Sequence, residues 1–320
     1  MSTITYQQKL VSVAETTLSI HLRLLENPSQ ALHFLHGNGF AVRSYDALLE
    51  GIAELEDLML QDAAGHGLSP AGDRFAGWEE SSYRFYRALI EQKQNQQWKD
   101  LVGVGHSFGG CMTLLMNHRD PQLFKQMVLL DPAWYPPEMI AQLNDMNEQD
   151  KRSKLLLVRQ TERRRTLWRD TPEVLSRLRG RGTFVGWQDR CLQDYVTYST
   201  HENKEGFRQL NCPPWLEAAV FGSSPSMLWQ AIAQLETPTY VIWGTDTHEM
   251  FQASYRLAQT MNSNLRFIEV QGDHCFMMQQ PDQTARLVRA VIDHNGETID
   301  ALKRSGFVLR CDDLPPHWLS

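Results

Sequence analysis

The chain has 320 residues, of which 42% are hydrophobic and 22% are charged, and its formal net charge is −7 at pH 7. This length allows one large domain, or one domain with an insertion, and the negative charge argues against general nucleic-acid binding. The sequence has no secretory leader pattern and no apolar run long enough to span a membrane, so we expect a cytoplasmic protein without membrane insertion. Five scattered cysteines lack a C-x-x-C pair, which favours neither a disulfide framework nor a zinc site.

Short apolar runs alternate with longer periodic runs along most of the chain. We expect strands at 9–14, 17–25, 31–35, 57–61, 101–104, 126–131, 239–243 and 265–270. We expect helices at 43–55, 79–97, 249–261 and 281–294. The first two strands are close enough to form a hairpin. Because strands that alternate with helices pair in parallel and are covered on both faces, the pattern predicts an α/β fold with a mostly parallel sheet.

The alternation is interrupted after Asp131, since the next core strand begins only at Thr239. A crossover between parallel strands needs about a dozen residues. We therefore expect a helical lid inserted at 134–234, and a core formed by 1–133 together with 235–320.

One part of the expected lid is strongly basic. Residues 151–181 contain eleven Lys or Arg against three acidic residues. A solvated helix face is the simpler interpretation. The alternative is that some of these arginines bind a carboxylate or phosphate of a substrate, or an acidic partner, through their planar donor groups.

The segment Gly105-His106-Ser107-Phe108-Gly109 follows an apolar strand and opens a helical run. A serine at such a turn occupies a strained backbone, and the flanking glycines let the chain pass closely while the hydroxyl stays exposed. The amide of Phe108 would lie at the helix N-terminus, free to donate to an oxyanion. The pattern indicates a nucleophilic serine, and the alternative is a glycine-rich turn with a serine cap.

These features together resemble the α/β-hydrolase superfamily. The resemblance rests on five segments in the superfamily's order, namely His36-Gly37-Asn38-Gly39-Phe40, the loop at 62–69, the serine turn, Trp243-Gly244-Thr245-Asp246 and Gly272-Asp273-His274. It implies the α/β-hydrolase fold, a doubly wound and mostly parallel sheet with an inserted helical lid.

The resemblance also implies roles for individual residues. Ser107 would attack an acyl carbonyl, and His274 would accept its proton and return it to the leaving group. Asp246 is the favoured acid beside His274, although it stands two residues after Gly244 where three is usual. Asp131, at the end of an earlier strand, is the alternative acid.

The second oxyanion donor is expected in the loop after the third strand. By resemblance it is the backbone amide of Asn38, which would act together with that of Phe108, and His36 would stabilise the loop. His33 and His36 are spaced like a pair of metal ligands, but residues three apart on a strand point to opposite faces. We therefore expect no metal and no organic cofactor.

The function implied is a serine hydrolase that cleaves a small to medium carboxylic ester, thioester or lactone through an acyl-enzyme. An anionic substrate would account for the arginines of the lid. Serine rather than aspartate at the turn argues against a haloalkane dehalogenase or an epoxide hydrolase. Carbon–carbon bond hydrolysis and cofactor-free haloperoxidase chemistry use the same triad and stay open. A non-catalytic ligand-binding module is a third class, against which the intact Ser107 and His274 argue.

Overall fold

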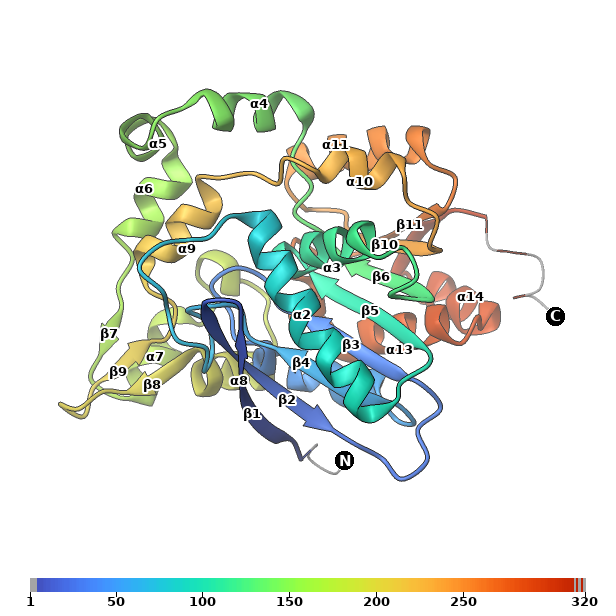
Figure 1. The fold of residues 1–320 in the computed structure, drawn as a ribbon, viewed down its shortest axis with the longest axis horizontal. Helices are drawn as coiled ribbons and strands as arrows, with labels where there is room; N and C mark the ends of the chain where they lie inside the picture. Colours follow the sequence, from blue (N-terminus) through green and yellow to red (C-terminus); the bar gives the residue numbers. More distant parts are fainter. Residues whose placement is uncertain (1–4, 314, 316–317, 319–320) are drawn as a thin grey trace.

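One large sheet runs through the centre of the molecule (Figure 1). The computed structural model describes residues 5–313, 315 and 318. Within this part of the chain, nine strands pair in the order β1-β2-β4-β3-β5-β6-β10-β11-β12. Their bounds are Gln7–Val13 (β1), Thr16–Arg23 (β2), Ala31–Leu35 (β3), Asp57–Gln61 (β4), Leu101–His106 (β5), Gln126–Leu130 (β6), Thr239–Gly244 (β10), Leu265–Val270 (β11) and Val308–Cys311 (β12).

The middle of the sheet is parallel and its edges are antiparallel. Neighbouring strands from β4 through β3, β5, β6 and β10 to β11 all pair in parallel. The hairpin β1–β2 joins β4 antiparallel on one side, and β12 joins β11 antiparallel on the other. Every residue of β3, β4, β5 and β6 is buried, as a sheet covered on both faces requires. The mostly parallel sheet predicted from the sequence is confirmed.

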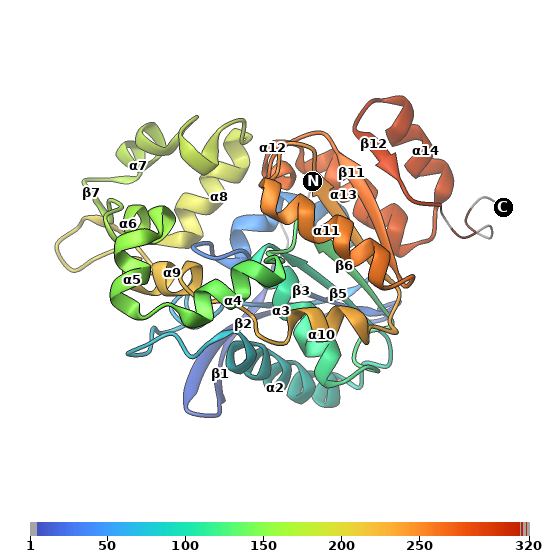
Figure 2. The same cartoon turned by 90° about the horizontal axis from the view of Figure 1, so that it is seen from above.

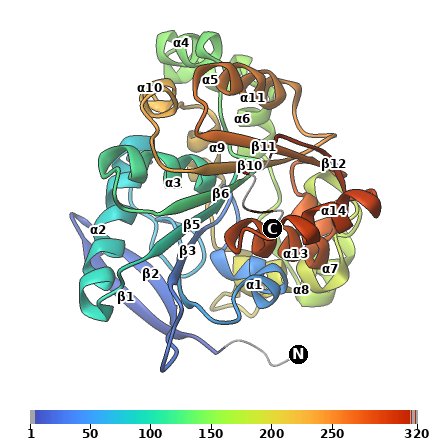
Figure 3. The same ribbon diagram turned by 90° about the vertical axis from the view of Figure 1, so that its right-hand side faces the viewer.

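Helices cover both faces of this sheet. Their bounds are Val42–Tyr45 (η1), Asp46–Ile52 (α1), Trp78–Gln96 (α2), Phe108–Arg119 (α3), Glu249–Met261 (α11), Phe276–Gln279 (α12), Pro281–Ile292 (α13) and Gly296–Arg304 (α14). Figure 3 shows α1 and α13 on one side of the strands and α2 and α3 on the other. A hydrophobic core lies on each face of the sheet, and alternate residues of β5 point into one or the other. Val102 and Val104 belong to the core on the α1 side, and Leu101 belongs to the core on the α2 side.

Most of the long segment between β6 and β10 lies beyond the end of the sheet toward which the arrow of β5 points (Figure 1). Its helices are Pro137–Asp145 (α4), Glu148–Lys154 (α5), Leu156–Glu162 (α6), Thr171–Leu178 (α7), Gly182–Phe184 (η2), Asp189–Ser199 (α8), Pro214–Phe221 (α9) and Leu228–Ala233 (α10). It also contains a small antiparallel sheet, which the sequence analysis did not expect, of Leu167–Trp168 (β7), Arg208–Leu210 (β9) and Thr200–Glu202 (β8). Two of these helices contact the layers that cover the sheet, since α8 packs on η1 and α1, and α10 packs on α3 (Figure 2) and on α11.

The chain continues beyond the last helix that the sequence predicted. Helix α13 buries the expected stripe that includes Leu287, Val288 and Val291. Helix α14 then packs on α13, and β12 closes the sheet edge at β11. In the described part of the chain, no helix combines the length and apolar character needed to cross a membrane.

Candidate active site

Ser107 lies at a sharp turn between β5 and α3. Its backbone has φ 53° and ψ −116°, a conformation that costs free energy for any residue other than glycine. The flanking glycines are required by space, because a Cβ on Gly105 would lie 2.5 Å from the Gly109 carbonyl oxygen. A Cβ on Gly109 would lie 2.3 Å from the Leu35 carbonyl oxygen. The tight turn expected from the sequence is therefore present, and it brings the Ser107 hydroxyl to the carboxyl edge of the sheet.

The loop after β11 brings His274 to this serine. Nε2 of His274 lies 2.9 Å from Oγ of Ser107, and Nδ1 lies 3.0 Å from Oδ1 of Asp131. With the neutral imidazole donating from Nδ1 to the carboxylate, Nε2 is left to accept the serine proton. These three side chains form one continuous hydrogen-bonded chain.

Asp131 is fully buried at the end of β6 and has a positive φ of 42°. Its Oδ1 accepts hydrogen bonds from Thr247 Oγ1 at 2.6 Å and from the Tyr255 hydroxyl at 3.0 Å. Its Oδ2 accepts from the Gly244 amide at 2.9 Å. A buried carboxylate requires such donors, and here they also fix the oxygen that faces the imidazole.

Asp246, the acid that the sequence analysis favoured, does not occupy the position beside His274. Its side chain is exposed, and its backbone amide donates to the Gly272 carbonyl at 2.9 Å. The structure gives the hydrogen bond with His274 to Asp131, the alternative acid. The reason is the order of the sheet, since β6 and β10 are neighbours and the end of β6 reaches the turn after β10.

The two expected oxyanion donors lie on either side of the serine turn. Phe108 is the first residue of α3, and Asn38 follows β3 in the adjacent loop. Among the described residues, neither backbone amide donates to a protein acceptor. Both residues also line the cavity that contains Ser107, so both amides are available to a bound oxygen atom.

His36 determines how the Asn38 amide is aimed. Its Nε2 accepts from the Ala63 amide at 2.9 Å, so its Nδ1 carries the proton and donates to the Gly37 carbonyl at 2.7 Å. That carbonyl and the Asn38 N–H belong to one planar peptide group, so fixing the first orients the second. Burial lowers the pKa of His36, which keeps the ring neutral for this role.

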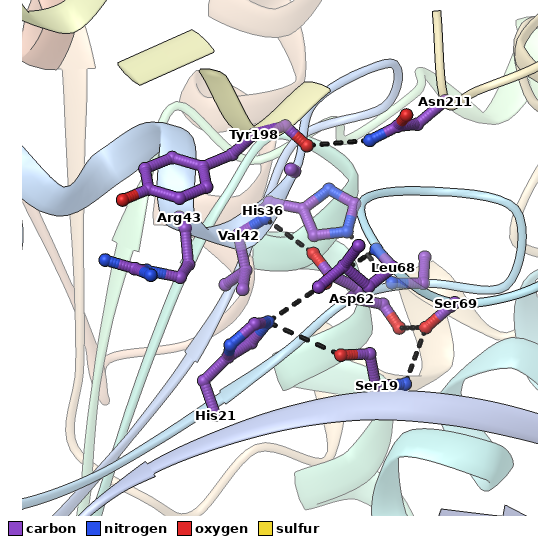
Figure 4. Close-up of polar contacts among 12 residues, drawn as sticks. Ser19, His21, His36, Val42, Arg43, Asp62, Leu68, Ser69, Tyr198 and Asn211 are labelled. Atoms are coloured by element: carbon purple, nitrogen blue, oxygen red, sulfur yellow. Dashed lines mark hydrogen bonds and ion pairs between the residues drawn. The ribbon is translucent and has the colours of Figure 1, made fainter. Parts of the chain in front are cut away.

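The carboxylate of Asp62, at the start of the loop at 62–69, is held by partners from three parts of the chain (Figure 4). Buried Asp62 accepts hydrogen bonds from His21 Nε2 at 3.1 Å, the Val42 amide at 2.8 Å and the Leu68 amide at 3.2 Å. Burial alone would raise the pKa of Asp62, but His21 and the other partners outweigh it and the pKa is lowered. The ionised carboxylate thus joins β2, η1 and the loop.

A cavity of about 680 Å³ opens above Ser107. Its floor comes from the loops after β3, β5 and β11, and its roof comes from η2, α6, α8 and α9 of the segment between β6 and β10. Most of its lining is apolar, and the aromatic residues that take part include Phe184, Tyr195 and Phe221. These three aromatic residues all belong to the segment between β6 and β10.

A model of the Alpha/beta hydrolase family matches residues 34–287. The chain belongs to this family. A serine hydrolase-like protein of Dictyostelium discoideum is 22% identical over 268 residues, covering 78% of this chain and 71% of that protein. The type I acyl-CoA thioesterase mpaH of Penicillium roqueforti is 25% identical over 189 residues, covering 53% of this chain but only 40% of the fungal protein.

Solved structures show the same fold. The peroxisomal α/β-hydrolase Lpx1 of Saccharomyces cerevisiae superimposes with a TM-score of 0.75 at 14% identity, covering 94% of this chain and 91% of the yeast chain. Membership of the family makes the protein a hydrolase.

Most of the basic residues in the hydrolase's segment 151–181 are paired with carboxylates. Eight of the eleven form ion pairs, several of them with acids outside the segment. Only Arg164 of the eleven lines the described cavity, where it pairs with Glu217 and contacts the Tyr195 hydroxyl. Burial alone would lower the pKa of Arg164, but these two neighbours outweigh it and the pKa is raised. The solvated-face interpretation is incomplete, because one arginine is part of the cavity wall.

His33 does not join His36. Its ring is fully buried and stacks on Phe124 at 6.0 Å between centroids. Burial lowers the pKa of His33 to about 3, so the ring is neutral. No group of three or more His, Cys, Asp or Glu side chains in the described ranges is arranged to hold a metal ion.

The sequence analysis missed several residues of the site. Thr247 and Tyr255 hold Asp131, and Glu217 holds Arg164 and, through its carbonyl, the Asn38 side chain. Hydroxyl residues on loops and helices have no characteristic spacing, so nothing in the sequence marks them. The pairing of Thr247 with a strand-end aspartate could have been suspected only once β6 and β10 were known to be neighbours.

Proposed function

We propose that this hydrolase is a serine hydrolase that cleaves the thioester or carboxylic ester of a small to medium acyl group, with Ser107 as nucleophile, His274 as general base and Asp131 as the orienting acid. The observation that carries the proposal is the hydrogen-bonded chain from Ser107 through His274 to Asp131 at the floor of the cavity.

The geometry supports a two-step reaction. As Ser107 Oγ attacks the acyl carbon, its proton passes to His274 Nε2, and the carbonyl oxygen takes on negative charge between the amides of Phe108 and Asn38. Collapse of this intermediate breaks the bond to the leaving group, which receives the proton from His274. Water then attacks the acyl-enzyme by the same route, and releases the carboxylic acid and Ser107.

The shape of the cavity supports a medium-sized substrate. Its volume of about 680 Å³ lies within the range of small-molecule sites. Its apolar lining favours a hydrocarbon portion of the substrate, and the likeness to an acyl-CoA thioesterase favours a thioester among the possible acyl donors. A lactone is a cyclic ester and would use the same steps.

We also propose that residues 134–234 act as a lid. Leu156 and Leu157 of α6 line the cavity although they are 59% and 49% exposed. Apolar side chains at the entrance of a cavity are suited to contact a substrate that has entered it. Closure of α6 over an acyl chain would exclude water from the intermediate.

Labelling with a fluorophosphonate probe tests the nucleophile. Wild type should be labelled, Ser107→Ala should not, and Ser153→Ala, on the exposed face of α5, should behave as wild type. Absence of labelling in folded wild type would instead support a ligand-binding module.

A substrate panel tests the reaction. It pairs acyl-CoA thioesters with p-nitrophenyl esters of the same chain lengths, and adds a vinylogous diketone and a halide with peroxide. Turnover of the thioesters or of the esters supports the proposal, and the faster class identifies the preferred acyl donor. Turnover of the diketone or the halide alone would replace it with carbon–carbon bond hydrolysis or haloperoxidase chemistry.

A further inference from the structure

His106, the residue before Ser107, is buried at the end of β5 and is not used by the mechanism above. Its ring lies 4.9 Å from the His274 ring, centroid to centroid. Both of its nitrogens have partners. Nδ1 lies 2.6 Å from the Tyr45 hydroxyl, and Nε2 lies 3.0 Å from the backbone carbonyl oxygen of His274.

The directions of these hydrogen bonds can be assigned from their partners. A carbonyl only accepts, so Nε2 of His106 carries the proton. The neutral ring then has an unprotonated Nδ1, which accepts from the Tyr45 hydroxyl. The Tyr45 oxygen in turn accepts from the Gly37 amide at 3.1 Å. Burial, together with the nearby His274, holds the pKa of His106 well below its ordinary value, in keeping with a ring that has one proton.

These hydrogen bonds connect the loop after β3 with the loop after β11, and the proposed reaction needs both loops. One end is Gly37, whose neighbour Asn38 is the proposed oxyanion donor. The other end is the backbone of His274, the proposed base. We propose that Tyr45 and His106 are a positioning pair, which sets the separation between the oxyanion loop and the catalytic histidine. This inference rests on the proposed function.

The packing around His106 supports this assignment. A Cβ on Gly37 would lie 2.8 Å from Nδ1 of His106, so the oxyanion loop is in close contact with the ring. Tyr45 is fully buried between Phe34 and Phe40. An apolar side chain in place of His106 would leave the buried Tyr45 hydroxyl hydrogen without an acceptor, and would remove the donor that the His274 carbonyl has in His106.

Three variants separate the two hydrogen bonds of His106, which are called the Tyr45 arm (to the Tyr45 hydroxyl) and the His274 arm (to the His274 carbonyl). Tyr45→Phe removes the hydroxyl and both of its contacts. His106→Asn keeps a polar atom near the position of Nδ1, and so retains the Tyr45 arm. His106→Gln keeps a donor near the position of Nε2, and so retains the His274 arm. Tyr240→Phe is the control, because Tyr240 is also buried but lies on β10 near the opposite end of the sheet.

Kinetics on the best substrate of the panel are the first measurement. Tyr45→Phe should lower kcat by about 10- to 100-fold with KM changed less than about threefold, because a misplaced donor weakens the transition state more than the bound substrate. The double variant Tyr45→Phe/His106→Gln should be no slower than the more impaired single variant, because both break the same bond. Additive losses, or an effect no larger than that of Tyr240→Phe, would overturn the proposal.

The second measurement does not depend on activity. Nitrogen-15 NMR of wild type should show His106 as the neutral Nε2–H tautomer between about pH 6 and 8. In Tyr45→Phe the His274 ring signals should shift in a protein that is still folded at the temperature of the measurement, although its melting temperature is lower than that of Tyr240→Phe because two buried groups lose a partner. An Nδ1–H tautomer at His106 would overturn the proposed chain even if the protein hydrolysed no tested ester. If the proposed function is wrong, wild type should hydrolyse no tested substrate while His106 still shows the Nε2–H tautomer. That result would still support Tyr45 and His106 as a structural link between the two loops.

Discussion

The carboxylate of Asp131 hydrogen-bonds the imidazole of His274, 143 residues later in the chain, at 3.0 Å. The contact is possible because β6 and β11 flank β10, and the carboxyl ends of these parallel strands meet at one edge of the sheet. Asp131 is also held by Thr247 and Tyr255, so the acid and its supports come from three different elements.

Replacing the carboxylate should therefore lower the turnover rate far more at Asp131 than at Asp246. Asp131→Asn should lower turnover by about ten-thousandfold, because an amide stabilises the imidazole in a tautomer that cannot accept the serine proton. Asp246→Asn, whose side chain is exposed at the cavity, should change turnover by less than about threefold. Turnover and melting temperature of both variants are to be measured, and a large loss confined to Asp246→Asn would return the role to that residue.

The serine turn should not tolerate a methyl group. Gly109→Ala places a Cβ 2.3 Å from a backbone oxygen, which should cost about 3 kcal/mol or more in unfolding free energy and abolish probe labelling of Ser107. Gly72→Ala is the matched control, because the nearest atom to its Cβ would be 3.9 Å away. Denaturant titration of both variants gives the comparison. Equal stability of the two would mean that the turn relaxes more easily than its contacts indicate.

The interface between α8 and α1 should make stability depend on pH. Burial, and next the nearby Asp46, raises the pKa of Asp194 from 3.8 to about 7. Because the folded state binds this proton more tightly than the unfolded state, its contribution is complete below about pH 4 and is lost as pH rises through 7. Wild type should thus lose melting temperature between pH 5 and 8, relative to Asp194→Asn.

The control for this prediction is Asp189→Asn, at the exposed start of α8. Its melting temperature should follow the wild-type curve. If Asp194→Asn also follows the wild-type curve across this range, the carboxyl group has an ordinary pKa and the interface is not a source of pH dependence.

The cysteines that lie close to Ser107 and His274 in the sequence, Cys111 and Cys275, should be unreactive. Burial raises the pKa of the Cys111 thiol and that of the Cys275 thiol, so neither is a thiolate at neutral pH. Iodoacetamide should modify both only after unfolding, and Cys111→Ala/Cys275→Ala should retain most of the turnover. Mass spectrometry of the native protein checks the first statement. Rapid native modification with parallel loss of turnover would indicate a thiol with a catalytic role.

Local patterns made the sheet, the serine turn and His274 predictable. The glycines around Ser107 and the alternation of strands and helices depend only on neighbours in the sequence. The choice between Asp131 and Asp246 depended on which strand ends meet in space, and the sequence does not state the strand order. Glu217, which neutralises Arg164, lies outside the basic segment that the sequence analysis counted.

Short elements escaped prediction for a different reason. Strands β7, β8 and β9 have two or three residues each, too few for a period-two pattern to be recognised. Helix α14 is amphipathic and begins after an Asn cap, but the sequence analysis assigned no helix or strand after residue 294. Strand β12 is stabilised by pairing with β11, and this pairing is not visible in the sequence.

The Arg164–Glu217 pair limits what the cavity can select. A substrate with a carboxylate at the end of its acyl chain would compete with Glu217 for the single positive charge of Arg164, and two acids would then share one counter-ion in a largely apolar chamber. If the proposed function is right, we expect the chamber to favour uncharged acyl chains. If the natural substrate is anionic, we infer that its charge resides on the departing alcohol or thiol. Arg159 and Arg163 line a separate surface groove on α5 and α6, outside the chamber.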